Sequence, residues 1–403
     1  MKHEDAAMTA TTTAMSRRRF LQRTAALAAA ASVSPVEFAF ASPAAAGRYD
    51  NLLVLIELKG GNDGFNTLVP YTDGAYYALR PKLAIARDAV VQLTDRVGLH
   101  PSLAPLTALW NDRQLAVLQG VGYPEPNLSH FRSIEIWDTA SKSSEYRQDG
   151  WLTRTFAGAP TPAAFAADGV IIGSNDMGPL AGGGSRAIAL ADPGRFVRQS
   201  RLAHIETAQG NSALLHVLKT ESDIVRAAAK LAGTHEFRTT FPQSPLGNAI
   251  ATACRVVANH DNVAAVRVTH NGYDTHGGQA ATQARLLREL GQGIVALRAA
   301  LSEIDRWQSA LVVTYAEFGR RPQENASAGT DHGTANVHFA MGGRVVGGMY
   351  GEAPALSGLA ANANVMHAID FRSVYATVLD QWWNVDSRAV LGGRHTPLPI
   401  LRA

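Results

Sequence analysis

The sequence contains almost no cysteine: Cys254 is the only one in 403 residues. A single thiol excludes an intramolecular disulfide and a cysteine-rich zinc site, but it leaves sites built from histidine and carboxylates open. The chain also lacks an excess of one charge, because 37 Lys and Arg oppose 34 Asp and Glu. This balance argues against a nucleic-acid-binding surface. With 46% hydrophobic residues, the composition is that of a globular protein.

The first 41 residues have the pattern of a twin-arginine export signal. Arg17-Arg18 precedes an Ala-rich run at Thr24–Val33, and Ala-Phe-Ala at 39–41 is a small-residue cleavage pattern. The alternative is a basic tail without a targeting role. The Ala-rich run is too short and too weakly apolar to cross a membrane comfortably, so we expect no stable membrane span after cleavage.

We therefore predict a signal peptide at residues 1–41 and a single domain at 42–403. Cleavage would remove five basic and three acidic residues, which lowers the formal net charge from +3 to +1. The predicted partner is the twin-arginine translocation machinery, which would deliver the folded chain to the periplasm or outside the cell. Proteins on this route often load a metal or cofactor before export.

Short runs rich in Val and Ile alternate with segments of helical apolar spacing, which predicts an α/β fold. The predicted strands are Leu52–Leu58, Leu115–Leu118, Gly169–Ile172, Val263–Val268, Ala310–Tyr315 and Val337–Met341. The predicted helices are Ser102–Trp110, Ser212–Leu231, Leu246–His260, Gln279–Ile304 and Phe371–Trp383. Because uninterrupted apolar strands are buried on both faces, we expect an α/β sandwich around a mostly parallel sheet.

In such folds, chemistry gathers beyond the carboxyl ends of the strands. The first predicted strand ends in a glycine-rich turn that presents Asp63, and the alternative there is an ordinary Asp-Gly turn. A phosphate-binding loop is disfavoured because the turn lacks the Gly-Lys-Ser/Thr ending.

Ser129 stands where a helix is predicted to begin, followed by His130. The simple interpretation is an N-cap that satisfies a free amide. A hydroxyl at a helix N-terminus can also attack phosphorus or hold an oxyanion, with His130 either assisting or only packing. No Gly-x-Ser-x-Gly motif surrounds the serine, which weighs against an α/β-hydrolase.

Three further polar segments follow or precede strands. Asp274 and His276, separated by one residue, have a workable spacing for two ligands of one metal, and His270 is a third candidate in the same loop. Glu317 ends a buried strand, where the alternative is a salt bridge to Arg320 or Arg321.

The last segment, Asp331-His332, leads into the final predicted strand, and its alternative is a plain loop turn. Polar groups at five strand ends together indicate a polar or metal site.

These segments carry a resemblance to a known family. The blocks LLVLIELKGGNDGFNTLVPY, NLSHFRS, NGYDTHGGQ, VVTYAEFGRRPQEN and GTDHGTANVHFAMGG, behind a twin-arginine signal, resemble the bacterial family named domain of unknown function 1501. That family is similar in turn to the alkaline phosphatase and sulfatase superfamily. The resemblance covers roughly Asn51 to Leu401 and implies a three-layer alkaline-phosphatase-like sandwich.

The same resemblance implies roles for individual residues. Asp63 matches a metal ligand, Ser129 the helix-capping nucleophile, Asp274 and His276 ligands of one metal, and His332 a late histidine ligand. Where the superfamily has Asp-His, this chain has Glu317-Phe318, so one histidine ligand is absent and the second metal position is in doubt. The formylglycine pattern of sulfatases is absent around Ser129 and Cys254, which disfavours ordinary sulfatase chemistry.

Two functions remain open on the sequence. The first is an exported metal-dependent hydrolase of phosphate or related esters, and the alternative is an exported binding or assembly protein with a degenerate site. We predict a divalent metal, zinc before calcium, manganese or magnesium. The predicted catalytic residues are Ser129 and His130, and the predicted metal ligands are Asp63, Asp274, His276, Glu317, Asp331 and His332.

Overall fold

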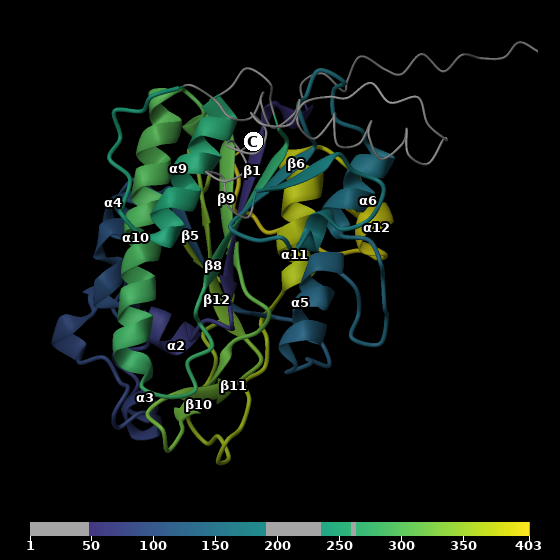
Figure 1. The fold of residues 1–403 in the computed structure, drawn as a ribbon. Helices are drawn as coiled ribbons and strands as arrows, with labels where there is room; N and C mark the ends of the chain where they lie inside the picture. Colours follow the sequence, from purple (N-terminus) through teal and green to yellow (C-terminus); the bar gives the residue numbers. More distant parts are fainter. Residues whose placement is uncertain (1–47, 191–234, 259–262, 403) are drawn as a thin grey trace, which may run out of the picture. The chain divides into compact units, whose positions relative to one another are not determined.

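The computed structural model describes residues 48–190, 235–258 and 263–402. Its centre is a nine-stranded sheet (Figure 1). In sheet order, the strands are β13 (Gly348–Tyr350), β5 (Leu115–Gly122), β12 (Asn336–Met341), β9 (Ala310–Tyr315), β1 (Leu52–Lys59), β8 (Ala265–Asn271), β6 (Gly169–Ile172) and β7 (Ala187–Leu190), and β14 (Ile369–Asp370) pairs with β5 beside this path. Only β12 runs antiparallel to its neighbours, so the sheet is mostly parallel, as the sequence predicts.

Helices cover both faces of this sheet and complete the three layers (Figure 1). One face carries α9 (Pro245–Ala258), α10 (Gln279–Glu303), and a 3-10 helix at Pro101–Leu106 that continues as α4 (Thr107–Asn111). The other carries α5 (His130–Thr139), α6 (Trp151–Gly158), α11 (Phe371–Ala376) with the π-helical segment Thr377–Trp382, and α12 (Ser387–Leu391).

Alternation along β1 shows why both faces need a cover. Leu52, Val54, Ile56 and Leu58 pack in the core under α9 and α10, whereas Leu53 and Leu55 pack in the core under α5, α6 and α11. Successive strand side chains point to opposite faces, so a strand that is apolar at nearly every position requires two apolar layers.

Smaller elements complete the described part. They are α2 (Gly64–Thr67), α3 (Gly74–Leu79), the sheet of β2 (Leu68–Val69), β4 (Gly98–Leu99) and β3 (Val91–Gln92), the hairpin of β10 (Arg320–Glu324) and β11 (Thr330–His332), and 3-10 turns at Arg48–Asp50, Arg87–Ala89, Gly178–Leu180 and Trp307–Ser309. No helix in the described ranges is long and apolar enough to span a membrane.

The predicted elements match these closely where they can be compared. All six predicted strands are present, and two have the predicted bounds, Gly169–Ile172 and Ala310–Tyr315. The predicted helix Ser212–Leu231 and the predicted signal at 1–41 lie outside the described residues. The strands not predicted are short or polar: β2, β3, β4, β7, β10, β11, β13 and β14.

The topology places all the predicted site segments at one edge of the sheet. Strands β1, β8, β9 and β5 run in the same direction, so the segments after their carboxyl ends meet there. The antiparallel β12 begins at this edge, which brings β11 to it as well.

Candidate metal centre

Six polar side chains gather at this edge. They are His130 at the start of α5, Asp274 and His276 after β8, Glu317 after β9, and Asp331 and His332 on β11. Each of the six was predicted as a site residue from the sequence. The side chains of Asp274 and His276 are both 46% exposed, so the cluster is open to solvent.

His130 is held by Glu317. Its Nδ1 lies 2.8 Å from Oε1 of Glu317, and because a carboxylate oxygen accepts, Nδ1 carries the proton. Glu317 is buried, and its two oxygens accept from the amide of Gly60 at 2.9 and 3.1 Å. The hydrogen bond from His130 to Glu317 raises the pKa of His130. Nε2 of the ring is left to face Asp274.

The other two imidazoles are oriented in the same way. Nδ1 of His332 donates to the carbonyl of Leu128 at 2.8 Å, and Nδ1 of His276 lies 3.4 Å from Oδ1 of Asp331. Asn325 donates to that Asp331 oxygen at 3.1 Å, which lowers the pKa of Asp331 together with the adjacent His276. All three rings therefore turn Nδ1 toward an acceptor and Nε2 toward the centre.

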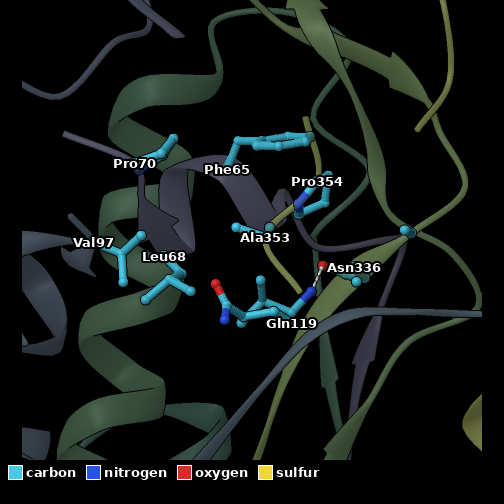
Figure 2. Close-up of a pocket in the computed structure, with 12 residues that line it drawn as sticks. Phe65, Leu68, Pro70, Val97, Gln119, Asn336, Ala353 and Pro354 are labelled. Atoms are coloured by element: carbon cyan, nitrogen blue, oxygen red, sulfur yellow. Dashed lines mark hydrogen bonds between the residues drawn. The ribbon is translucent and has the colours of Figure 1, made fainter. Parts of the chain in front are cut away.

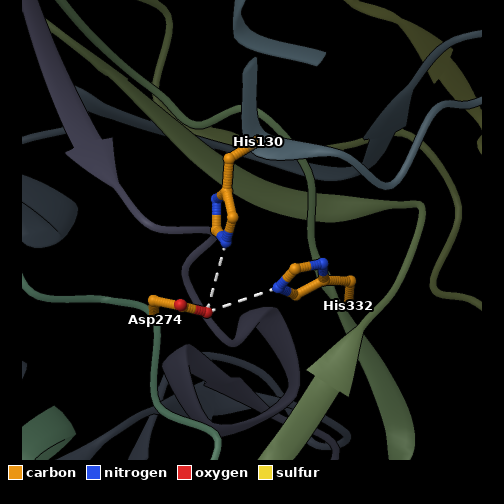
Figure 3. Close-up of side chains that lie close together, drawn as sticks. All are labelled: His130, Asp274 and His332. Carbon is orange, nitrogen blue, oxygen red and sulfur yellow. Dashed lines mark hydrogen bonds and ion pairs between the residues drawn. The ribbon is translucent and has the colours of Figure 1, made fainter. Parts of the chain in front are cut away.

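The three Nε2 atoms converge on one carboxylate oxygen. They lie 3.4, 3.0 and 3.3 Å from Oδ1 of Asp274 for His130, His276 and His332 respectively. Figure 3 shows the rings of His130 and His332 pointing toward the Asp274 carboxylate. Nε2 of His276 is also 2.9 Å from Nε2 of His332. Nε2 of His130 is buried and forms no hydrogen bond in the described part of the chain.

This convergence has an electrostatic consequence. With the protons on Nδ1, the three Nε2 atoms and Oδ1 of Asp274 point four lone pairs at one small volume. Oδ1 also accepts from Arg320, so the unmatched lone pairs are those of the Nε2 atoms, and a metal ion or a proton on one Nε2 atom would stabilise them.

Arg320 fixes the carboxylate at the centre. Its Nη2 donates to Oδ1 of Asp274 at 2.7 Å, and the guanidinium is fully buried. Partial burial opposes ionisation of Asp274, but the hydrogen bond and charge of Arg320 outweigh it and lower the pKa of Asp274. Burial lowers the pKa of His332, which favours the neutral ring that a metal requires.

Asp63 lies apart from the cluster in a buried ion pair. Its carboxylate accepts from Nη1 and Nη2 of Arg80 at 2.5 and 3.0 Å, and both side chains are fully buried. It also accepts from Gln279 at 2.5 Å and from the amide of Phe65 at 3.1 Å, where it caps α2. The structure thus brings the other predicted ligands together but gives Asp63 different partners.

Ser129 is the N-cap of α5 and is exposed. Its side chain makes no capping hydrogen bond, and its amide donates to Oδ1 of Asn127 at 2.9 Å. The hydroxyl is therefore not used by the helix, although Ser129 directly precedes His130 of the cluster.

His270, expected in the loop with Asp274 and His276, lies on β8 and is buried. Its Nδ1 lies 3.0 Å from the hydroxyl oxygen of Tyr273, and its Nε2 lies 3.3 Å from Oε2 of Glu289. Burial lowers the pKa of His270 to about 4. Its hydrogen bonds hold the base of the loop that carries Asp274.

A separate apolar pocket lies beside α2 and β5, lined by residues that include Phe65, Leu68, Val97 and Gln119 (Figure 2). Its volume is about 30 Å³, room for about one water molecule, and none of the six cluster side chains lines it. This pocket is too small for a substrate and belongs to the packing of the sheet edge.

Two residues that hold the site were not recognised from the sequence. Arg320 was considered only as an ion-pair partner of Glu317, and Asn325 was not considered. In the structure Arg320 pairs with Asp274, and Asn325 donates to Asp331 and to the carbonyl of His276. Arg320 begins β10 five residues after β9 ends, and nothing in the local sequence indicates its pairing with Asp274.

The fold and the cluster define an α/β protein with a histidine and carboxylate site at the carboxyl edge of a mostly parallel sheet. The chain belongs to the family described as "Protein of unknown function (DUF1501)", which matches residues 50–393. No curated protein matches the sequence.

Solved structures similar to the chain include members of the alkaline phosphatase superfamily. One is a protein of that superfamily from Vibrio parahaemolyticus, with a TM-score of 0.43, 9% identity, and coverage of 86% of this chain and 70% of that one. A phosphonate monoester hydrolase from Silicibacter pomeroyi has a TM-score of 0.40, 12% identity, and coverage of 86% and 75%. The alkaline phosphatase from the Antarctic bacterium TAB5 has a TM-score of 0.33, 11% identity, and coverage of 75% and 94%. Likenesses this distant transfer no residue's role.

Proposed function

We propose that this chain is a metal-dependent hydrolase of phosphate or related esters. One divalent ion would be held by Nε2 of His130, His276 and His332 and by Oδ1 of Asp274. The observation that carries the proposal is the convergence of these four atoms, with each Nδ1 turned to an acceptor behind it. Histidine ligands of metals are oriented in this way by carboxylates and backbone carbonyls.

The separations fit a small ion. Ligands about 2.0–2.1 Å from a tetrahedral zinc ion are about 3.3 Å from one another. Oδ1 of Asp274 lies 3.0 to 3.4 Å from the three Nε2 atoms, and the ligand atoms of His130, Asp274 and His332 all lie within 4.8 Å of one another. His276 lies outside that group, so its ring would have to move toward the ion to bind it as the fourth ligand. Three imidazoles and one carboxylate are also a donor set that favours zinc over calcium or magnesium.

The charge of the site favours a cation as well. The carboxylates of Asp274, Glu317 and Asp331 are opposed by two guanidiniums, that of Arg320, which pairs with Asp274, and that of Arg321, which acts on Asp331. With neutral imidazoles these five groups leave one negative charge. In this arrangement Glu317 and Asp331 orient His130 and His276 rather than bind the ion themselves.

A bound divalent ion would supply a Lewis acid that polarises an ester oxygen and makes a nearby hydroxyl easier to deprotonate. Ser129 is the nucleophile that we propose for this site. Ser129 is an exposed residue next to His130 at the N-terminus of α5, and its hydroxyl forms no cap hydrogen bond. The partial positive charge of that helix end stabilises an alkoxide or a phosphoryl oxygen.

We also propose that the chain is exported by the twin-arginine machinery after cleavage of residues 1–41, leaving a single domain at 42–403 in the periplasm or outside the cell. Arg17-Arg18 ahead of the Ala-rich run supports this proposal. With both arginines changed to lysine, mature protein should no longer appear outside the cytoplasm. Export in the normal amount would contradict it.

A second candidate is an exported binding protein that holds a metal without turnover. It is supported by the placement of Asp63, whose carboxylate is occupied by Arg80 and Gln279. The cluster then offers ligands for one ion, whereas two-metal hydrolysis needs a second set.

Metal content combined with a substrate panel separates these two functions. Purified wild type, His276→Ala and Ser129→Ala would be analysed for zinc and assayed on nitrophenyl phosphate, bis-nitrophenyl phosphate, nitrophenyl phosphonate and nitrophenyl sulfate. The hydrolase predicts about one zinc per chain in wild type and in Ser129→Ala, with turnover in wild type alone. Zinc without turnover on any ester supports the binding protein, and absence of metal overturns both.

A further inference from the structure

We infer that Arg320 is the positioning residue that assembles the metal centre and sets its affinity for the ion. The inference rests on the proposed metal site and concerns a residue outside the ligand set. The Arg320 side chain donates to hydrogen-bond acceptors in several segments of the site. Arg320 is fully buried on β10, yet every nitrogen of its guanidinium donates a hydrogen bond.

The acceptors belong to three separate segments of the site. Nε donates to the carbonyl of Gly61 at 2.7 Å, in the turn after β1, and Nη2 donates to the carbonyl of Gly60 in the same turn. Nη1 donates to the carbonyl of Thr330 at 2.9 Å, on β11 two residues before His332. The guanidinium therefore ties the first strand's turn to the hairpin that carries a ligand.

The third segment is the loop after β8. Nη2 of Arg320 donates to the carbonyl of Tyr273 at 3.1 Å and to Oδ1 of Asp274 at 2.7 Å. The loop can approach the turn after β1 because Gly60 has φ of +114°, and a Cβ there would lie 2.4 Å from the amide of Asp274. Tight backbone contact and the shared guanidinium together fix where Asp274 stands.

The position of Asp274 determines the geometry of the centre, because Oδ1 is the atom on which three imidazoles converge. Arg320 also reaches Glu317 indirectly, since the turn that it holds by Gly60 supplies the amide that Glu317 accepts from. Loss of the guanidinium's hydrogen bonds would free Asp274 to move. It would also weaken the hold of Glu317 on the His130 ring. Mutation of a residue that hydrogen-bonds to a metal ligand typically lowers metal affinity about 10–100-fold.

Arg80 provides a matched control. It is also fully buried, pairs with a carboxylate, and donates to the carbonyls of Pro322 at 2.6 Å and Arg321 at 2.9 Å on the same strand β10. Its partner Asp63 lies outside the cluster. Lysine at either position keeps the charge and loses the planar fork.

The test is the zinc dissociation constant of wild type, Arg320→Lys and Arg80→Lys, measured by competition with a chromophoric chelator under native conditions. We expect zinc affinity to fall about 10–100-fold in Arg320→Lys and to stay within about twofold in Arg80→Lys. Denaturant midpoints should fall in both variants. Equal zinc affinity in Arg320→Lys and wild type overturns the inference while leaving the metal site intact.

An equal loss of affinity in Arg80→Lys also overturns it, because general destabilisation would then explain the effect. A wild type that binds no zinc overturns both this inference and the proposed function. Should Arg320→Lys fail to fold, Arg320→Met combined with Asp274→Asn removes both charges together. We expect zinc affinity to fall below that of Asp274→Asn alone, because the contacts of Arg320 with Gly60 and Thr330 are lost as well. Zinc affinity equal to that of Asp274→Asn would overturn the inference that Arg320 assembles the centre.

Discussion

Oε1 of Glu317 lies 2.8 Å from Nδ1 of His130, and Nε2 on the opposite side of the same ring faces Asp274. Glu317 is itself held by the amide of Gly60. The His130 ring, the Glu317 carboxylate and the Gly60 amide thus form one chain of hydrogen bonds from the turn after β1 to the cluster.

The first prediction concerns this chain. Glu317→Gln keeps the shape of the side chain but removes its charge. The hydrogen bond to that carboxylate raises the pKa of His130 and makes Nε2 a better electron donor to a metal ion. We expect zinc affinity to fall about 10–100-fold in a chelator competition assay. The control is Glu324→Gln, whose carboxylate accepts from the amides of Lys82 and Leu83 instead. Unchanged affinity in Glu317→Gln would remove Glu317 from the site.

The second prediction concerns Ser129. Because its hydroxyl makes no cap hydrogen bond, Ser129→Ala should change the free energy of unfolding by less than about 0.5 kcal/mol while abolishing hydrolysis. Asp386 is a cap that does accept, from the amide of Arg388 at 3.0 Å, so Asp386→Ala should cost about 0.5–2 kcal/mol. Urea unfolding measures both. Turnover at the wild-type rate in Ser129→Ala would exclude covalent catalysis by this residue.

The third prediction separates Asp63 from the metal. Asp63→Asn leaves the buried charge of Arg80 unpaired, which should cost about 3–5 kcal/mol in urea unfolding. Zinc content per folded chain should stay the same, because Asp63 is saturated by Arg80 and Gln279. Asp73 caps α3 with a hydrogen bond to Ala75 and lacks such an ion pair, so Asp73→Asn is the matched variant. Loss of zinc in Asp63→Asn alone would make Asp63 a ligand after all.

The fourth prediction is a pH dependence of stability. His338 on β12 is buried against Trp137, and neither ring nitrogen has a hydrogen-bond partner among the described residues. Burial lowers the pKa of His338 to about 3. The unfolded chain binds a proton on this residue near pH 6.5, so His338 makes stability fall as pH drops below 6.5, by up to about 1.4 kcal/mol per unit.

His338→Leu should therefore flatten the pH dependence. Comparison of urea unfolding at pH 5.5 and pH 4.5 isolates the residue, since other buried histidines are common to both proteins. We expect wild type to lose about 1.4 kcal/mol more than the variant over this interval. Parallel pH dependences would contradict the assignment of a neutral buried ring.

The sheet and the edge that carries the site could be predicted from the sequence because their signals are local. Uninterrupted apolar runs such as Leu52–Leu58 identify buried strands, and parallel strands bring the segments beyond their carboxyl ends to one edge. Asp274 and His276 were placed on one site by the single residue between them, and Oδ1 of Asp274 does lie 3.0 Å from Nε2 of His276.

The partners of the charged groups could not be predicted in this way. The Asp63 carboxylate accepts hydrogen bonds from Arg80 and Gln279, which are 17 and 216 residues away in the sequence. Whether these acceptor positions are filled therefore depends on how three distant segments pack. Arg320 is three residues from Glu317 yet pairs with Asp274, since β10 turns its side chain into the gap between loops. Sequence spacing indicates which residues reach the edge, whereas tertiary packing decides which atoms face one another.

The central claim is that one ion lies among His130, Asp274, His276 and His332. Crystals of the zinc-loaded chain, measured above and below the zinc absorption edge, test it most directly. The account predicts one anomalous peak about 2.0–2.2 Å from the three Nε2 atoms and from a carboxylate oxygen of Asp274. An absence of any peak among these four side chains, or a peak bound to Asp63 instead, would contradict it.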